Sequence, residues 1–240
     1  MKRKIVFFIL FVSMVSCFRE ECWSAGQEVT KRFDLKEFEY LIVSGQFDIV
    51  LVQDSVNYAL VTCGENMIGM VSLIQCFDSL DMQQETVKNI ARTYKRTEIE
   101  LHFVQLTSIE LDNCTRMTSK FPVTSRTLCI WDDSSVSELD LEIDCIDFNL
   151  FVSLQNSGIY KIRGEALNCG LKLQGSAHFR LENLVTDSTR FIHSGIGDCY
   201  VNTKRILAGK IEKRGALFYK AYPSLQLHIE NINGKIVEIR

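Results

Sequence analysis

The chain has 240 residues, which is enough to bury the core of one long domain or of two small ones. Its formal net charge is −3 and residues of both signs are interspersed, which excludes the clustered basic surface of a nucleic-acid-binding protein. It has only two prolines and no linker rich in glycine, serine and proline, so we expect one domain behind a leader.

The first residues have the anatomy of an export signal. Lys2, Arg3 and Lys4 form a basic start, and residues 5–18 are uncharged and almost wholly apolar. This stretch is shorter than the roughly 20 residues that a membrane-spanning helix needs, and it suits a signal peptide. We therefore predict export, with residues 1–16 as the signal peptide.

Two cleavage sites remain open. Residues 14–17 (MVSC) resemble a bacterial lipobox, in which a small residue precedes the cysteine that becomes lipidated, although Met14 stands where leucine is usual. Cys17 would then carry a stable lipid anchor, followed by a tether over residues 17–37. The alternative is cleavage near residues 25–26, which leaves a soluble secreted protein. Either way we expect the periplasm, the outer membrane or the cell surface.

The chain contains nine cysteines, and setting Cys17 aside leaves eight. An even number permits full pairing in an oxidising compartment. No two cysteines have the C-x-x-C spacing, which leaves a zinc site or a redox motif without support. We expect few disulfides or none.

The next segments read as β structure with interruptions. Apolar residues alternate over residues 38–82, which predicts strands. Residues 67–77 are apolar enough to predict a short helix within that span. Residues 83–96 are polar and do not alternate, so we expect a surface loop or a loose helical turn. From Thr97 the alternation resumes and predicts the first coils, with an insertion at residues 119–124.

The C-terminal half carries a repeat. A small residue followed by alternating apolar positions recurs at spacings that are, by subtraction, 19, 20, 18 and 19 residues. The leading residues are Gly158, Ala177, Gly197, Gly215 and Gly234. A period near twenty with strand-like alternation indicates stacked β coils. The sequence therefore predicts an all-β, single-stranded parallel β-helix behind a β-rich N-terminal segment.

Aligning the coils assigns side chains to inward and outward columns. The expected inward residues are Tyr160, Phe179, Cys199, Leu217 and Ile236, and next to them Ile162, Leu181, Val201 and Tyr219. The outward row between them has two cations followed by three apolar residues: Lys161, Arg180, Tyr200, Phe218 and Val237. We call this row the outward stripe. It predicts a surface for a partner or for self-association, unless a tail or loop covers it.

Parallel β-helices also carry polysaccharide lyases and hydrolases, whose sites need converging carboxylates. The candidates here are Asp132, Asp133, Glu142, Asp144 and Asp147. Asp132 and Asp133 are neighbours, so they point to opposite faces of a strand or lie on a turn. This is the composition of an ordinary polar turn, and we predict no catalytic residue.

The histidines do not suggest a metal site. His178 and Asp198 fall in one outward column, and we expect at most a surface ion pair between them. His193 does not align with His178, which argues against a two-histidine metal site. No phosphate-binding loop, nucleophile elbow or H-E-x-x-H motif occurs, so we predict no cofactor and no metal.

Residues 38–49 (FEYLIVSGQFDI) and residues 194–198 (SGIGD) carry a resemblance to a known family. They resemble the opening and the repeated SGSGD turn of the "head GIN" domain family of putative autotransporter adhesins. Residues 215–223 (GALFYKAYP) resemble its closing G-x-V-x-Y-x-G-x-P, with Ala221 in place of a glycine, and residues 175–177 (GSA) are a degenerate copy of the turn. The resemblance spans about residues 38–240. It implies a right-handed parallel β-helix exported by Gram-negative Bacteroidetes-type bacteria, often as a lipoprotein, with no agreed catalytic residues.

These observations favour a non-catalytic cell-envelope or surface protein that binds a glycan or a protein through one face. It would contact the membrane through a lipid anchor, with self-association as a further expectation. The alternatives are a carbohydrate-active enzyme and a structural spacer. An enzyme would gather carboxylates with raised pKa values in one groove, whereas a binding protein would expose aromatic residues such as Tyr200 and Phe218 on one face. A spacer would show neither.

Overall fold

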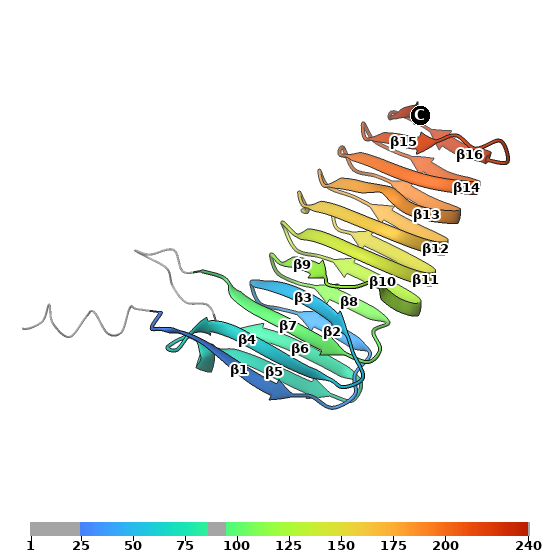
Figure 1. Ribbon diagram of the computed structural model, residues 1–240. Helices are drawn as coiled ribbons and strands as arrows, with labels where there is room; N and C mark the ends of the chain where they lie inside the picture. Colours follow the sequence, from blue (N-terminus) through green and yellow to red (C-terminus); the bar gives the residue numbers. More distant parts are fainter. Residues whose placement is uncertain (1–24, 86–94, 240) are drawn as a thin grey trace, which may run out of the picture.

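The computed structural model describes residues 25–85 and 95–239. The predicted signal peptide, Cys17 and much of the expected polar loop lie outside the described residues. Strands account for 67% of the structure and wind into a β-solenoid of about seven turns (Figure 1). This confirms the predicted right-handed parallel β-helix. In the described part of the chain, no helix is long and apolar enough to cross a membrane.

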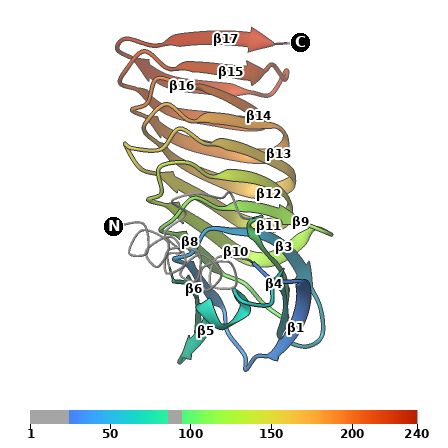
Figure 2. The same ribbon diagram turned by 90° about the vertical axis from the view of Figure 1, so that its left-hand side faces the viewer.

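Long strands that stack in parallel form the C-terminal half (Figure 2). These are β11 (Glu138–Val152), β12 (Ile159–Leu173), β13 (His178–His193) and β14 (Asp198–Ile211). The first part of β14 pairs with β15 (Ala216–Lys220), and its last part pairs with β16 (Gln226–Asn231). The strand β17 (Lys235–Ile239) then pairs with β15. One long strand therefore contributes to two faces of the solenoid.

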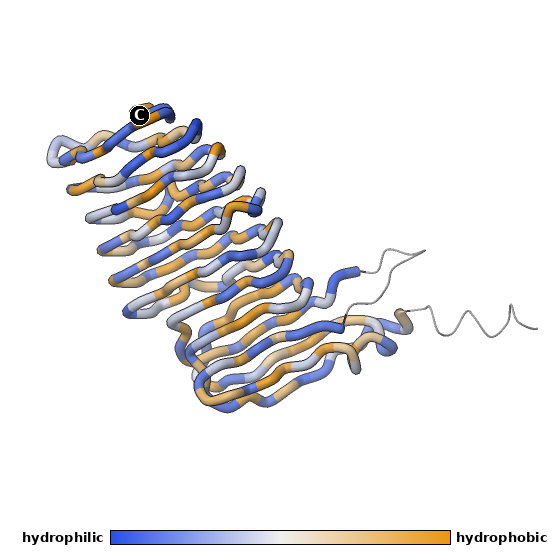
Figure 3. The backbone as a smooth tube through the Cα atoms, turned by 180° about the vertical axis from the view of Figure 1, so that it is seen from behind, coloured by the Kyte–Doolittle hydropathy of each residue, from blue (hydrophilic) through white to orange (hydrophobic). Residues whose placement is uncertain are grey.

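The inward columns are those expected from the alternation. Tyr160, Phe179, Cys199 and Leu217 are buried in register on successive coils, and so are Ile162, Leu181, Val201 and Tyr219. Figure 3 shows the same alternation as hydrophobic and hydrophilic segments along each coil. Ile236 is the exception. It is 37% exposed because β17 is the last strand of the stack in the described part of the chain.

The N-terminal coils follow a different order from the chain. The coil of β2 (Tyr40–Val43) and β3 (Phe47–Gln53) lies between two others in the stack. On one side lie β6 (Ser79–Gln84) and β7 (Thr97–Phe103), and on the other β8 (Ser108–Leu111) and β9 (Arg116–Ser119). The strand β10 (Val123–Asp132) then joins β8 to β11. The prediction that coils begin at Thr97 was therefore wrong, because the coil of β2 and β3 already belongs to the stack.

Antiparallel strands cover the N-terminal end of the solenoid. The strand β4 (Tyr58–Gly64) pairs with both β1 (Glu28–Asp34) and β7, and β5 (Val71–Cys76) pairs with β6. The predicted helix over residues 67–77 was wrong. Only a single turn of 3-10 helix, η2 (Ile68–Met70), forms there, because pairing with β6 satisfies the backbone of β5. The strand β1 lies in the segment expected to be a tether, so the folded part begins before residue 38.

Candidate functional site

The outward stripe forms a single column on the structure. The register places Lys161 beside Arg180, and Arg180 beside Tyr200. Tyr200 lies beside Phe218, which lies beside Val237. The structure thus brings together all five residues of the predicted surface, on β12, β13, β14, β15 and β17. The last strand adds Val237 to the stripe and does not cover it.

Direct contacts join the middle of the stripe. The rings of Tyr200 and Phe218 stack with their centroids 4.4 Å apart and their planes at 8°. The guanidinium of Arg180 lies over the Tyr200 ring, 4.7 Å from its centroid. Its Nη2 is 2.7 Å from Oε1 of Glu182, and this contact raises the pKa of Arg180. The stripe therefore presents a cationic end and an aromatic end as one ordered ladder.

A small, shallow depression adjoins the cationic end of the stripe. It measures about 230 Å³, and Lys161 and Arg180 form part of its lining. At its margin Arg163 pairs with Asp140 and, through a 3.2 Å Nε–Oε2 contact, with Glu142. Because the depression is smaller than most ligand pockets, the stripe offers a binding face and no enclosed site.

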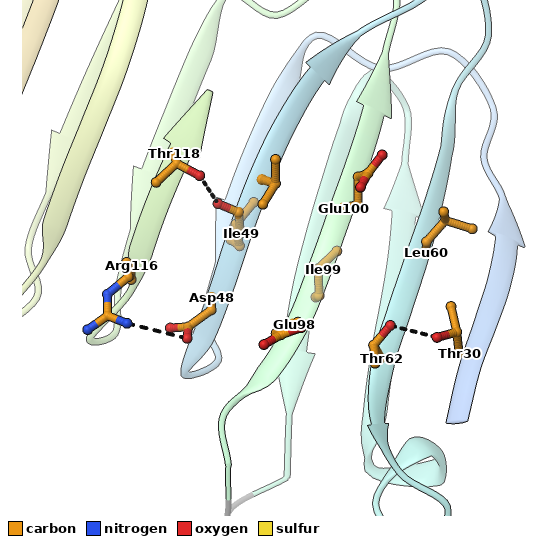
Figure 4. Close-up of a pocket in the computed structure, with 11 residues that line it drawn as sticks. Thr30, Asp48, Ile49, Leu60, Thr62, Glu98, Ile99, Glu100, Arg116 and Thr118 are labelled. Carbon is orange, nitrogen blue, oxygen red and sulfur yellow. Dashed lines mark hydrogen bonds and ion pairs between the residues drawn. The ribbon is translucent and has the colours of Figure 1, made fainter. Parts of the chain in front are cut away.

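A larger groove lies on the N-terminal half, over β1, β4, β7, β3 and β9 (Figure 4). It measures about 420 Å³ and contains the carboxylates of Asp48, Glu98 and Glu100. Each carboxylate lies near a basic side chain: Arg116 at 3.7 Å from Asp48, Lys95 at 2.9 Å from Glu98, and Lys120 at 3.5 Å from Glu100. Paired charges of this kind are the usual arrangement of a solvated sheet face.

A buried histidine beside this groove was not identified from the sequence. The ring of His102 stacks on Tyr58 with centroids 3.9 Å apart. Its Nδ1 is 3.0 Å from Oδ2 of Asp54, and its Nε2 is 2.9 Å from Oε1 of Glu100. The pKa of Asp54 is lowered mainly by the hydrogen bond from the backbone N–H of Ser55, and next by the hydrogen bond with His102. Glu100 is two residues from His102 on the same strand, but Asp54 and Tyr58 come from a distant part of the chain, so no local pattern could have linked them to the histidine.

The candidate catalytic carboxylates do not converge. Asp132 points into the core, where its Oδ2 accepts a 2.7 Å hydrogen bond from the Tyr160 hydroxyl. Asp147 accepts a hydrogen bond from Asn168 at 2.9 Å, and Glu142 pairs with Arg163. Asp133 and Asp144 are exposed. Asp132, Asp147 and Glu142 are therefore already engaged by other side chains.

The histidines expected near the surface also have other partners. His178 and Asp198 share a column, but the ring Nδ1 of His178 faces the backbone N–H of Asp198 at 3.4 Å. The expected ion pair with the carboxylate is therefore not formed. His193 is buried, with Nε2 at 2.9 Å from the carbonyl oxygen of Gly197. Across residues 25–85 and 95–239, no group of three His, Cys, Asp or Glu side chains is placed to hold a metal.

The fold and this surface can be compared with known proteins. The sequence profile of the family described as "Putative auto-transporter adhesin, head GIN domain" matches residues 37–223. The chain belongs to the head GIN domain family. No curated protein matches this head GIN chain.

Solved structures share the head GIN fold. A putative adhesin from Bacteroides fragilis has 19% identity and a TM-score of 0.80, with 89% of this chain and 97% of that chain covered. A putative adhesin from Parabacteroides merdae has 15% identity and a TM-score of 0.61, covering 90% and 97%. A protein from Parabacteroides distasonis described as "Putative lipid binding protein" has 15% identity and a TM-score of 0.65, with 90% of this chain and 98% of that chain covered. At these identities the likeness establishes the fold alone.

The motifs that carried the resemblance have definite places in this head GIN domain. Residues 38–49 lead into β2 and turn into β3 at Ser44 and Gly45. Residues 194–197 make the turn from β13 into β14, and residues 215–223 contain β15 and the turn that follows it. The family signatures therefore mark turns between coils, and the stripe lies on the strands that these turns position.

Proposed function

We propose that this head GIN protein is a non-catalytic binding protein of the cell envelope, and that it binds a glycan or protein ligand along the outward stripe. Membership of an adhesin-like family supports an exported surface role. The observation that carries the proposal is the column itself, in which Tyr200 and Phe218 stack beside Arg180 on successive coils. Aromatic and arginine side chains are the residues most enriched at binding hot spots.

The two alternatives are less well supported. An enzyme needs converging carboxylates, whereas Asp132 is buried against Tyr160, Glu142 pairs with Arg163 and Asp147 accepts a hydrogen bond from Asn168. A spacer needs no ordered row of cationic and aromatic side chains on its outer face. Burying the rings of Tyr200 and Phe218 against a ligand would stabilise the complex through the hydrophobic effect. Neither an enzyme nor a spacer requires these two rings on the outer face.

The proposal is tested by binding to printed glycans and to immobilised mucin and extracellular-matrix proteins. We expect the wild-type chain to bind a subset of these probes, and Tyr200→Ala combined with Phe218→Ser to lose most of that binding. Phe121→Ser is the matched control, because Phe121 is 57% exposed and lies in the turn between β9 and β10. Equal binding by the stripe variant and the control would refute the proposed surface.

We further propose that Cys17 is lipidated after removal of residues 1–16 and holds the domain at a membrane. Mass spectrometry of the N-terminal peptide from an exporting Gram-negative host should find an acylated Cys17. The variant Cys17→Ala should leave the membrane fraction. An N-terminus near residues 25–26 in the wild-type chain would instead establish the secreted form.

A further inference from the structure

A second outward column carries an aromatic pair on a different face of the solenoid. Trp131 is the residue before the last of β10 and lies in register with Phe151 of β11. Their rings stack with centroids 4.0 Å apart and planes at 15°, and Trp131 is 47% exposed. Because each ring covers one face of the other, the free face of Phe151 is directed toward the next coil, where Lys172 is its register partner and Gly170 lies two residues before Lys172.

That next coil contains a hollow. Gly170 occupies an outward position of β12 between Asn149 and Arg190 on the neighbouring coils. Its φ is not positive, so the backbone does not require a glycine there. A glycine inside a strand weakens it and often marks a place that something approaches closely. The side chain of Asn149 lies over Gly170, in the place that a Cβ there would take, and both residues line a hollow of about 460 Å³, which we call the polar hollow. This volume is within the range of small-molecule sites.

The side chains around the polar hollow have free hydrogen-bonding capacity. Across the described residues, the side chains of Asn149, Ser188 and Arg190 make no hydrogen bond or ion pair with one another or with other side chains. Asp147 accepts one hydrogen bond from Asn168 and keeps further acceptor capacity. An amide, a carboxylate and a guanidinium are planar groups that can each bind two adjacent hydroxyls.

The spacing along β11 places the Trp131–Phe151 pair close to the polar hollow. Phe151 is two residues beyond Asn149 on the same strand and the same face, which is roughly 7 Å. A pyranose ring seated over Gly170 would reach the free face of Phe151 with its C–H bonds, and the planar polar groups with its hydroxyls. Apolar rings beside a few convergent polar groups are the usual lining of a small-ligand site.

We propose that the polar hollow and the Trp131–Phe151 pair form a carbohydrate-binding site for a pyranose glycan. The site lies on the face that the C-terminal parts of β10, β11, β12 and β13 form. It is separate from the outward stripe. It goes beyond the proposed function by naming a second surface and one ligand class. Phe151 supplies the stacking surface, and Asn149, Asp147 and Arg190 supply the hydroxyl contacts.

The experiment measures binding of the full processed chain to dextran, xylan, chitin oligosaccharides, polygalacturonate, hyaluronan and mucin glycans. We expect at least one of them to bind, and Gly170→Val and Phe151→Ala to weaken that binding by about ten-fold or more. The Cβ that Gly170→Val adds would displace the amide end of Asn149, and so removes one of the proposed hydroxyl contacts from its place. Ala208→Val is the matched control, because Ala208 lies in the same outward column beyond Arg190 and does not line the hollow.

A second readout reports on the site itself. The chain has two tryptophans, so Trp23→Phe leaves Trp131 as the sole tryptophan, which can be excited apart from the tyrosines. Saturating glycan should change Trp131 emission and protect it from iodide quenching, and Gly170→Val, with an unchanged denaturation midpoint, should lose both effects. Failure of every glycan to bind, or wild-type binding by Gly170→Val, would overturn the proposal. Loss of glycan binding in Phe218→Ser alone would place the sugar on the stripe, which overturns this site and leaves the proposed function standing.

Discussion

Asp132 is a carboxylate inside a mostly apolar column. It lies in register with Val152, which is followed in that column by Leu173, His193 and Ile211. Its Oδ1 accepts a 2.9 Å hydrogen bond from the backbone N–H of Ser134, and the Tyr160 hydroxyl donates to Oδ2. The local sequence around Asp132 and Asp133 has the composition of a polar turn. Only the pairing of β10 with β11 shows that one of the two aspartates is inside.

Burial raises the pKa of Asp132 above its ordinary value of 3.8. A carboxyl that holds its proton more tightly in the folded state destabilises folding as the pH rises from its unfolded pKa through its folded pKa. Relative to Asp132→Asn, the free energy of unfolding of the wild type should therefore fall as the pH is raised from about 4. Urea denaturation across a pH series measures this difference. The exposed neighbour variant Asp133→Asn is the control, and a difference between wild type and Asp132→Asn that stays constant with pH would contradict the prediction.

Phe179 is the central ring of the inward column. It is fully buried, stacks on Tyr160 at 5.1 Å and meets the edge of His193 at 6.5 Å. Phe179→Ala should lower the free energy of unfolding by about 3–5 kcal/mol through lost burial and a cavity. Chemical denaturation measures the change, with the outward Phe218→Ala expected to cost much less. An unchanged midpoint would remove Phe179 from the core.

At the scale of the element, a coil is one strand that turns a corner. Gly164 of β12 has a φ of +108°, and a Cβ there would overlap the carbonyl oxygen of Ile143 on the previous coil. Left-handed backbone of this kind strains any residue with a side chain. A glycine requirement at this corner is not visible in the period of the repeat, which reports only where apolar residues recur.

Gly164→Ala should therefore destabilise the domain by more than about 1 kcal/mol. Gly69→Ala provides the comparison, because a Cβ at Gly69 has no neighbour within 4 Å and the backbone there is not left-handed. Thermal and urea denaturation of both variants give the two changes. Similar midpoints for the two variants would show that Gly164 is not under strain.

The period predicted the C-terminal coils because coils that are adjacent in sequence are adjacent in space there. Lys161, Arg180 and Tyr200 could be placed in one column from spacing alone. The N-terminal coils could not be predicted in this way, since β2 pairs with β6 and β8, which are far from it in sequence. The polar hollow was not predicted, because the columns derived from the repeat covered only the residues that follow each small leading residue. Asn149, Gly170 and Arg190 follow the same period further along each coil.

At the scale of the whole molecule, the two ends of the solenoid differ. The antiparallel strands β1, β4 and β5 cover the N-terminal end, whereas β16 and β17 end the stack with Leu227 and Ile236 exposed. Asn231 and Glu238 occupy inward positions of these last strands, in register with Ile211 and Tyr219. Inward-pointing polar and charged residues discourage a free edge from pairing with another chain.

Glu238→Val should consequently promote end-to-end self-association, because it removes the charge from the inward row of β17. Analytical ultracentrifugation should detect larger species for this variant than for the wild type. Glu230→Val is the control, since Glu230 is exposed on the outward side of β16 beside Lys210. Identical sedimentation of Glu238→Val and wild type would mean that Glu238 does not protect this edge.

Binding without chemical change of the ligand is tested most directly by incubating the purified chain with the polysaccharide and mucin panel and measuring, in one sample, both the ligand retained and the products released. We predict retention of at least one ligand, with no new reducing or unsaturated chain ends. Release of such ends, abolished by Asp147→Asn, would show that the chain is an enzyme.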